Sequence, residues 1–148
     1  MQQPLYGLIG GKLGHSYSKI IHEKIADYTY ELLPLPTEAE ARTFMERRAF
    51  AAINVTIPYK QFVIPYCDVV DPKAQSIGAV NTIVNRDGKL YGYNTDYAGF
   101  AYLAGVHGVD FAGKTVLVRL RRRCGGSCTR CRACRRRRHQ TQSFCSAR

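Results

Sequence analysis

Two groups of polar residues in this sequence have the types and spacing to hold a small anionic ligand. The first is the segment Asn54-Val55-Thr56-Ile57-Pro58-Tyr59-Lys60. Apolar residues precede it, so Asn54, Thr56 and Lys60 come at the carboxyl end of a predicted strand, where open α/β sheets bind their ligands. Pro58 removes a backbone donor and fixes its own φ, which predicts that the strand stops there. Ordering three polar side chains costs conformational entropy, and a bound ligand would offset that cost.

The second group is Ser16 and Ser18, in His15-Ser16-Tyr17-Ser18 at the start of a helix predicted over residues 16–26. Free backbone N–H groups and the helix dipole favour an anion at such a position. Two hydroxyls on alternate residues can grip a small carboxylate there. A plain serine N-cap is the alternative interpretation, and the residues alone fit both.

Three further residues allow a structural interpretation beside a functional one. Lys60 also fits an exposed loop. Asp96, in Gly92-Tyr93-Asn94-Thr95-Asp96, fits the first turn of a helix, where the dipole stabilises an acid. Asn81 fits the polar end of a strand. The four histidines have no metal-ligand spacing, so we assign no metal site.

The apolar pattern and the turn signals predict strands that alternate with helices. Thr37 and Glu40 have the spacing of a capping box, and Asp87-Gly88 predicts a hairpin. This order of elements predicts an α/β layered domain with a mixed, mostly parallel sheet. Strands are expected over residues 5–9, 28–33, 51–56, 78–85 and 90–93, helices over 16–26, 37–48 and 95–103, a short helix or turn over 61–66, and a loop with a short helix over 67–75.

Charge and cysteine are distributed very unevenly along the 148 residues. The formal net charge is +11, but residues 119–148 contain 11 of the 22 Lys and Arg and none of the 11 Asp and Glu. The first 118 residues are therefore neutral by this count, and they hold one of the six cysteines, Cys67. A lone cysteine, no leader-like start and no apolar run near the ~18 residues that span a bilayer predict a cytoplasmic protein without a membrane partner.

The glycines between Gly7 and Gly14 do not form a dinucleotide-binding loop. Such a loop needs glycines separated by one residue and then by two, and that spacing is absent here. We therefore assign no cofactor-binding residue.

Four segments together resemble the shikimate dehydrogenase family, in the family's order and across most of residues 5–118. They are Ser16-Tyr17-Ser18, the segment from Asn54 to Lys60, Gly78-Ala79-Val80-Asn81-Thr82, and Gly92-Tyr93-Asn94-Thr95-Asp96. The family more often has proline after the second serine, where this chain has Lys19.

The resemblance implies NADP-dependent, reversible reduction of 3-dehydroshikimate to shikimate, a step of aromatic amino-acid biosynthesis. It implies that Ser16 and Ser18 bind the substrate carboxylate and that Thr56, Asn81 and Asp96 bind ring hydroxyls. Lys60 and Asp96 would be the catalytic pair, with Lys60 also touching substrate. The role of Asn54 stays open between contacting the ligand and only bracing its strand. In the full-length family a homodimer is one arrangement that the resemblance allows.

The resemblance divides the chain into three parts. Residues 1–112 correspond to the substrate-binding domain, and 113–118 to the first strand of an NADP-binding domain that is otherwise missing. Residues 119–148 are predicted to be a disordered basic tail, since they hold too few apolar residues to fold. Arginine stands where the family has its glycine turn, so we expect this chain to be inactive by itself.

Three interpretations of the tail remain open. A shifted reading frame turns GC-rich codons for Gly and Ala into Arg, Cys and Ser codons, which explains why Arg and Cys become abundant together. The spacing of four cysteines resembles that of the ligands in a zinc or iron–sulfur site, but the order of the gaps matches no familiar motif. They are Cys124, Cys128, Cys131 and Cys134. The arginines would bind nucleic acid without specificity, so a basic nucleic-acid-binding protein is one alternative function of the chain.

The second alternative function does not involve the tail. It is a non-catalytic module that binds shikimate or quinate.

The frame-shift hypothesis has a direct test in the gene. Sequencing across codon 119 should reveal that another frame encodes a glycine-rich turn and a second domain directly after Val118. The hypothesis is wrong if no frame does so.

Overall fold

The computed structural model describes residues 4–14 and 16–115. The chain divides into two compact units, Met1–Tyr102 and Leu103–Arg148, and the fold below is that of the first. The basic tail and most of the strand predicted at 113–118 lie outside the described residues. No helix in the described part of the chain is long and apolar enough to cross a membrane.

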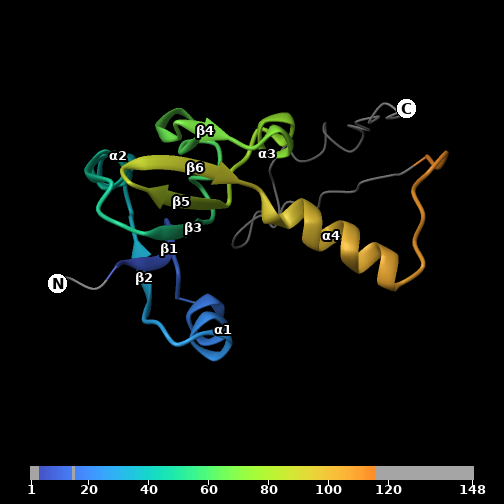
Figure 1. The fold of residues 1–148 in the computed structure, drawn as a ribbon, viewed down its shortest axis with the longest axis horizontal. Helices are drawn as coiled ribbons and strands as arrows, with labels where there is room; N and C mark the ends of the chain where they lie inside the picture. Colours follow the sequence, from blue (N-terminus) through green and yellow to red (C-terminus); the bar gives the residue numbers. More distant parts are fainter. Residues whose placement is uncertain (1–3, 15, 116–148) are drawn as a thin grey trace, which may run out of the picture. The chain divides into compact units, whose positions relative to one another are not determined.

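A six-stranded mixed sheet forms the centre of the first unit (Figure 1). The strand order is β2-β1-β3-β5-β6-β4. β1 pairs in parallel with β2 and β3, and β4 with β6, whereas β5 is antiparallel to β3 and β6. The predicted fold class, an α/β domain with a mixed, mostly parallel sheet, is therefore confirmed. The strands are β1 Tyr6–Gly10, β2 Tyr30–Pro34, β3 Ala52–Val55, β4 Val69–Val70, β5 Thr82–Arg86 and β6 Lys89–Tyr93.

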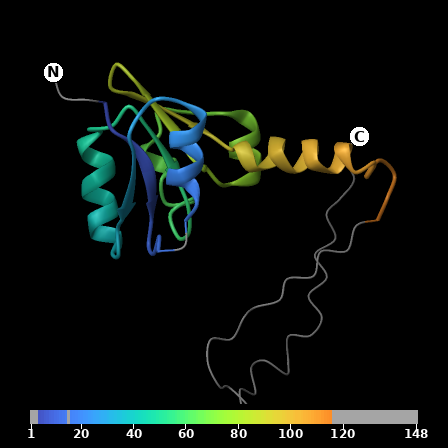
Figure 2. The same ribbon diagram turned by 90° about the horizontal axis from the view of Figure 1, so that it is seen from below.

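Helices cover both faces of the parallel part of the sheet. Figure 2 shows α1 and α2 on opposite sides of the strands between them. The helices are α1 Ser18–Ile25, α2 Glu38–Arg47, α3 Pro72–Ile77 and α4 Thr95–Val106, with a short 3-10 helix η1 at Ile64–Tyr66.

Local sequence signals explain two of these boundaries. The Thr37 side chain accepts from the Glu40 N–H while the Glu40 carboxylate accepts from the Thr37 N–H, so the predicted capping box at the start of α2 is confirmed. Asp87 and Gly88 both have positive φ, 52° and 82°, which is the backbone of a two-residue type I′ hairpin turn. The predicted hairpin between β5 and β6 is confirmed as well.

Three predicted elements were wrong in part. The loop expected at 67–75 contains a short strand, β4, which exists only because it pairs with β6, far along the chain. The strand expected from Gly78 begins at Thr82, because Gly78 adopts φ +70° as the C-cap of α3 and its N–H donates to the carbonyls of Ala74 and Gln75. Likewise, α1 begins at Ser18 rather than Ser16.

Alternate residues of the strands pack on the two faces of the sheet. On one face, Ile9, Ile53 and Val55 join the main core with Met45 of α2 and Ile83 of β5. On the other face, Leu8, Leu13 and Tyr30 form a smaller buried cluster. Two residues of this second cluster, Leu8 and Leu13, line the cavity that is described below as the candidate functional site.

An ion pair joins the end of α2 to the hairpin. The Arg48 guanidinium contacts the Asp68 carboxylate at 2.8 Å and donates to the Gly88 carbonyl at 2.6 Å. Asp68 also accepts from the Leu90 N–H at 2.7 Å. The Leu90 N–H, and then the Arg48 guanidinium, hold the pKa of Asp68 below its ordinary value.

This depressed pKa predicts a pH-dependent contribution to stability. The contribution is fully present above the unfolded-state pKa of about 3.9 and is lost as the pH falls through the lower folded-state pKa. Asp68→Asn should therefore lower the free energy of unfolding at pH 7, and its difference from the unchanged chain should shrink on acidification. Urea unfolding at several pH values measures this. Asp87→Asn, on the neighbouring turn, is the control and should keep the unchanged chain's pH profile; a pH-independent effect of Asp68→Asn would contradict the prediction.

Candidate functional site

The segment after β3 is held by backbone hydrogen bonds on two sides. The Thr56 N–H donates to the Ile9 carbonyl at 2.9 Å, and the Ile57 carbonyl accepts from the Gly11 N–H at 3.1 Å. Gly10 is required here because a Cβ at its position would lie 2.5 Å from the Thr56 methyl group. The segment is thus fixed against the loop that follows β1.

Two further hydrogen bonds anchor the same segment, at Tyr59 and at Lys60. Tyr59 is buried, and its hydroxyl donates to the Leu35 carbonyl at 2.6 Å. The Lys60 carbonyl accepts from the Val80 N–H at 2.8 Å. These contacts fix the backbone of Lys60, whose own side chain is 32% exposed.

All the residues predicted from the sequence as substrate-binding or catalytic line one cavity of about 550 Å³. The cavity lies beside the carboxyl ends of β1 and β3 and the start of α4. It therefore brings together predicted site residues that are up to 80 positions apart in the sequence. These predicted residues are Ser16, Ser18, Thr56, Lys60, Asn81 and Asp96.

Lys60 and Asp96 form an ion pair in the wall of this cavity, with 2.6 Å between Lys60 Nζ and Asp96 Oδ2. The Asp96 side chain is 59% exposed. Exposed ion pairs contribute only about 0–1 kcal/mol to stability, so folding alone gives little reason for this one. The pair fixes the Lys60 ammonium group in the wall of the cavity.

Asn81 positions the helix that carries Asp96. Its side-chain carbonyl accepts from the Thr95 N–H at 2.9 Å, and its amide donates to the Thr95 hydroxyl at 2.9 Å. The Asn94 side chain accepts from the Tyr97 N–H at 3.2 Å and caps the same helix end. Asn81 is buried, with 8% of its surface exposed, so these bonds satisfy a group that water barely reaches.

A second polar chain supports the floor of the cavity. The Tyr30 hydroxyl donates to Asn54 Oδ1 at 2.7 Å, and the Asn54 amide donates to the Thr82 hydroxyl at 3.1 Å. Burial raises the pKa of Tyr30, so its hydroxyl stays protonated and remains a donor. Asn54 therefore braces β3 against its neighbours, which is one of the two roles left open for it, and it also lines the cavity.

The two serines line the cavity at the start of α1: Ser18 is the first residue of the helix, and Ser16 lies just before it. The Ser16 hydroxyl accepts from the Ser18 N–H at 3.2 Å. Lys19, in the position where the family more often has proline, donates to the Tyr30 carbonyl at 2.7 Å and pairs with Glu23 at 2.9 Å. Glu23 in turn accepts from the Tyr30 N–H at 3.2 Å, so the two side chains fasten α1 to β2.

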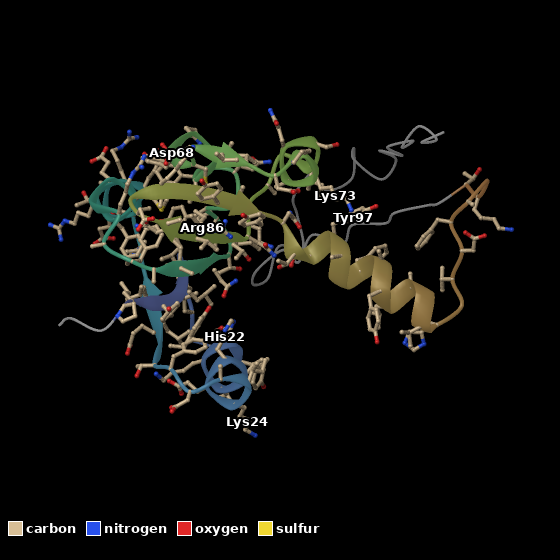
Figure 3. The ribbon with its side chains drawn as sticks, viewed as in Figure 1. His22, Lys24, Asp68, Lys73, Arg86 and Tyr97 are labelled. Atoms are coloured by element: carbon tan, nitrogen blue, oxygen red, sulfur yellow. The ribbon has the colours of Figure 1, made fainter. Side chains whose placement is uncertain are left out.

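Three polar lining residues were not singled out from the sequence: Lys12, His22 and Thr95. His22 stacks on Tyr30 with ring centroids 4.1 Å apart, and Figure 3 shows it on the side of α1 that faces the sheet. Its spacing of four residues from Ser18 is a signal that could have indicated a shared helix face. Lys12 follows the carboxyl end of β1, which is the other signal that was available.

A mixed sheet with a polar cavity beside the carboxyl ends of its parallel strands is typical of an α/β domain that binds small molecules. The sequence model for the shikimate dehydrogenase substrate binding domain matches residues 8–83, about half of the chain. The chain belongs to the shikimate dehydrogenase family, so the predicted resemblance is confirmed.

Individual relatives agree with this assignment. The NADP(+) shikimate dehydrogenase of Clostridium perfringens strain SM101 is 42% identical over 121 residues, which cover 77% of this chain and 45% of that protein. The crystal structure of shikimate dehydrogenase 1 from Peptoclostridium difficile has a TM-score of 0.68 at 35% identity, over 76% of this chain and 44% of the other. The Thermus thermophilus enzyme in complex with NADP(H) and shikimate has a TM-score of 0.65 at 34% identity, over 74% and 44%. The chain thus spans less than half the length of these relatives.

The bonds around Asn81 generate a prediction about how the site is held. The Thr82 hydroxyl also donates to the Asn81 side-chain carbonyl at 3.1 Å. Asn81→Ala leaves this hydroxyl, and the N–H and hydroxyl of Thr95, without their partner, so the free energy of unfolding should fall by about 2–4 kcal/mol. Chemical denaturation measures the loss. Gln75→Ala, at an exposed helical position, is the control and should change stability by less than about 0.5 kcal/mol. An equal effect of the two substitutions would contradict the positioning role of Asn81.

Proposed function

We propose that this chain carries the substrate-binding half of an NADP-dependent shikimate dehydrogenase, which reversibly reduces 3-dehydroshikimate to shikimate. The observation that carries the proposal is the Lys60–Asp96 pair in the wall of a cavity whose lining also includes several hydroxyl and amide groups. Family membership supports the same activity, as do relatives whose names give it.

The lining suits a small ring that carries a carboxylate and several hydroxyls. Ser16 and Ser18 bind the carboxylate, beside the free N–H groups of the first turn of α1. Thr56, Asn81 and Asp96 bind ring hydroxyls. Because a site built to hydrogen-bond hydroxyls leaves its own polar groups unpaired with an analogue that lacks them, it rejects such analogues strongly.

Lys60 and Asp96 carry out the proton transfer. In the direction of reduction, Lys60 donates a proton to the carbonyl oxygen of the substrate as that oxygen gains negative charge. Asp96 holds the Lys60 ammonium group in place in the cavity wall through their 2.6 Å ion pair. A positioned acid of this kind accounts for about two to four powers of ten in rate.

The hydride would come from NADP(H), but the described residues offer no site that fits this cofactor. Gly10 ends β1 and Gly11 follows it, yet a Cβ on either would meet Thr56 or Pro58 of the same chain, so these glycines serve internal packing. We therefore attribute cofactor binding to the part of the family fold that follows residue 112, with residues 1–112 as the substrate domain. A cytoplasmic setting agrees with the free thiol of Cys67.

Calorimetric titration of the 148-residue chain with shikimate tests the proposal. We expect weak but saturable binding to the unchanged chain and a loss of affinity of at least about tenfold in Lys60→Ala, since a charge-assisted hydrogen bond is removed. Lys73→Ala, on α3 outside the cavity, should bind like the unchanged chain (Figure 3). The absence of shikimate binding to a folded chain, or equal binding by both variants, would overturn the proposal.

A further inference from the structure

The cavity carries one positive charge that no neighbouring acid compensates. Its described lining residues include two lysines, Lys12 and Lys60, and one carboxylate, Asp96. Asp96 is already paired with Lys60. Lys12 is exposed and forms no ion pair with any residue that the structure describes. With histidine counted as neutral, the described lining therefore has a formal charge of +1, which suits a ligand with a single negative charge.

The backbone on both sides of Lys12 is anchored, although its side chain is exposed. The Gly11 N–H donates to the Ile57 carbonyl at 3.1 Å, which ties the residue before Lys12 to the segment that carries Lys60. The residue after it, Leu13, is buried, and its carbonyl accepts from the Ser16 N–H at 3.0 Å. The Lys12 side chain therefore starts from a fixed point, in the same turn that leads to the two serines.

We propose that Lys12 is the charged partner of the ligand's carboxylate and binds it together with Ser16 and Ser18. This inference rests on the proposed function, whose ligand has one carboxylate. Serine hydroxyls and backbone N–H groups supply direction but no full charge. Lys60 is not available for the carboxylate, because Asp96 holds it and the proposed reaction needs it at the ring. A lysine ammonium on a flexible stem acts as a point charge that reaches an anion without fixed geometry.

The size of the effect follows from the exposure of Lys12. Exposed ion pairs are weak and screened by salt, whereas hydrogen bonds to a charged partner are about twice as strong as neutral ones. Removing the charge should therefore weaken shikimate binding by about three- to tenfold at low ionic strength. The effect should shrink as salt is added. If Lys12 is an ordinary solvated lysine, removing its charge should change neither the affinity for shikimate nor the way that affinity varies with salt.

The experiment compares two ligands and three variants of the 148-residue chain by NMR titration. Lys12→Met removes the charge and keeps most of the side-chain length, and Lys12→Arg keeps the charge. Lys24→Met is the matched control, because Lys24 lies on the side of α1 that points away from the sheet (Figure 3) and does not line the cavity. Shikimate is compared with its methyl ester, which has the same ring and hydroxyls but no carboxylate.

We expect Lys12→Met to weaken binding of shikimate and to leave binding of the ester unchanged. Lys12→Arg and Lys24→Met should bind shikimate within about twofold of the unchanged chain, since each keeps a cation in the cavity. If shikimate binds and Lys12→Met binds it equally well, or weakens both ligands alike, the role of Lys12 is wrong while the proposed function stands. If the folded, unchanged chain binds no shikimate, the proposed function fails and the inference fails with it.

Discussion

The site depends on the backbone hydrogen bonds that hold the segment Thr56–Lys60 in place. This segment leaves the sheet after β3, and its polar backbone groups would be unpaired without the bonds to Ile9, Gly11 and Val80. Those partners belong to β1, to the loop after β1 and to the approach to β5. The bonds that satisfy the segment therefore also bring three separate parts of the chain to one cavity. Tyr59 is buried, and its hydroxyl donates to the Leu35 carbonyl, which anchors the segment. The next residue, Lys60, lies in the wall of the cavity.

The polar groups around the cavity are of two kinds, and the difference explains how a ligand can be selected. Asn81 and Asn54 are committed to Thr95, Tyr30 and Thr82, so they keep their orientations without a ligand. Lys12, Ser18 and the Lys60–Asp96 pair lie at more open positions. A preorganised floor below adaptable charged groups lowers the entropy that binding must overcome. The hydrogen-bonded side chains of Asn54 and Asn81 thus fix the shape of the cavity, and Lys12, Lys60 and Asp96 supply its charges.

The departure at Lys19 shows how the fold accommodates a change at a critical turn. Proline at that point would favour the helical start through its fixed φ. Lysine instead forms a clip with Glu23 around the backbone of Tyr30. This clip fastens the first turn of α1 to β2. Because the clip depends on two exposed charges, added salt should weaken it.

The sequence by itself determined the features that depend on neighbouring residues. Thr37 with Glu40 predicted the start of α2, Asp87-Gly88 predicted the hairpin, and the four family segments predicted six of the residues that line the cavity. Only the tertiary structure decided that β4 exists, because a strand of two residues has no signal apart from its partner β6. It also gave the 2.6 Å distance of the Lys60–Asp96 pair that the resemblance only implied, and it decided that Asn81 holds α4. Of the two lysines that line the cavity, it left Lys12 without an ion pair among the described residues. Each of these depends on distances between residues far apart in the chain, which local propensity and spacing do not contain.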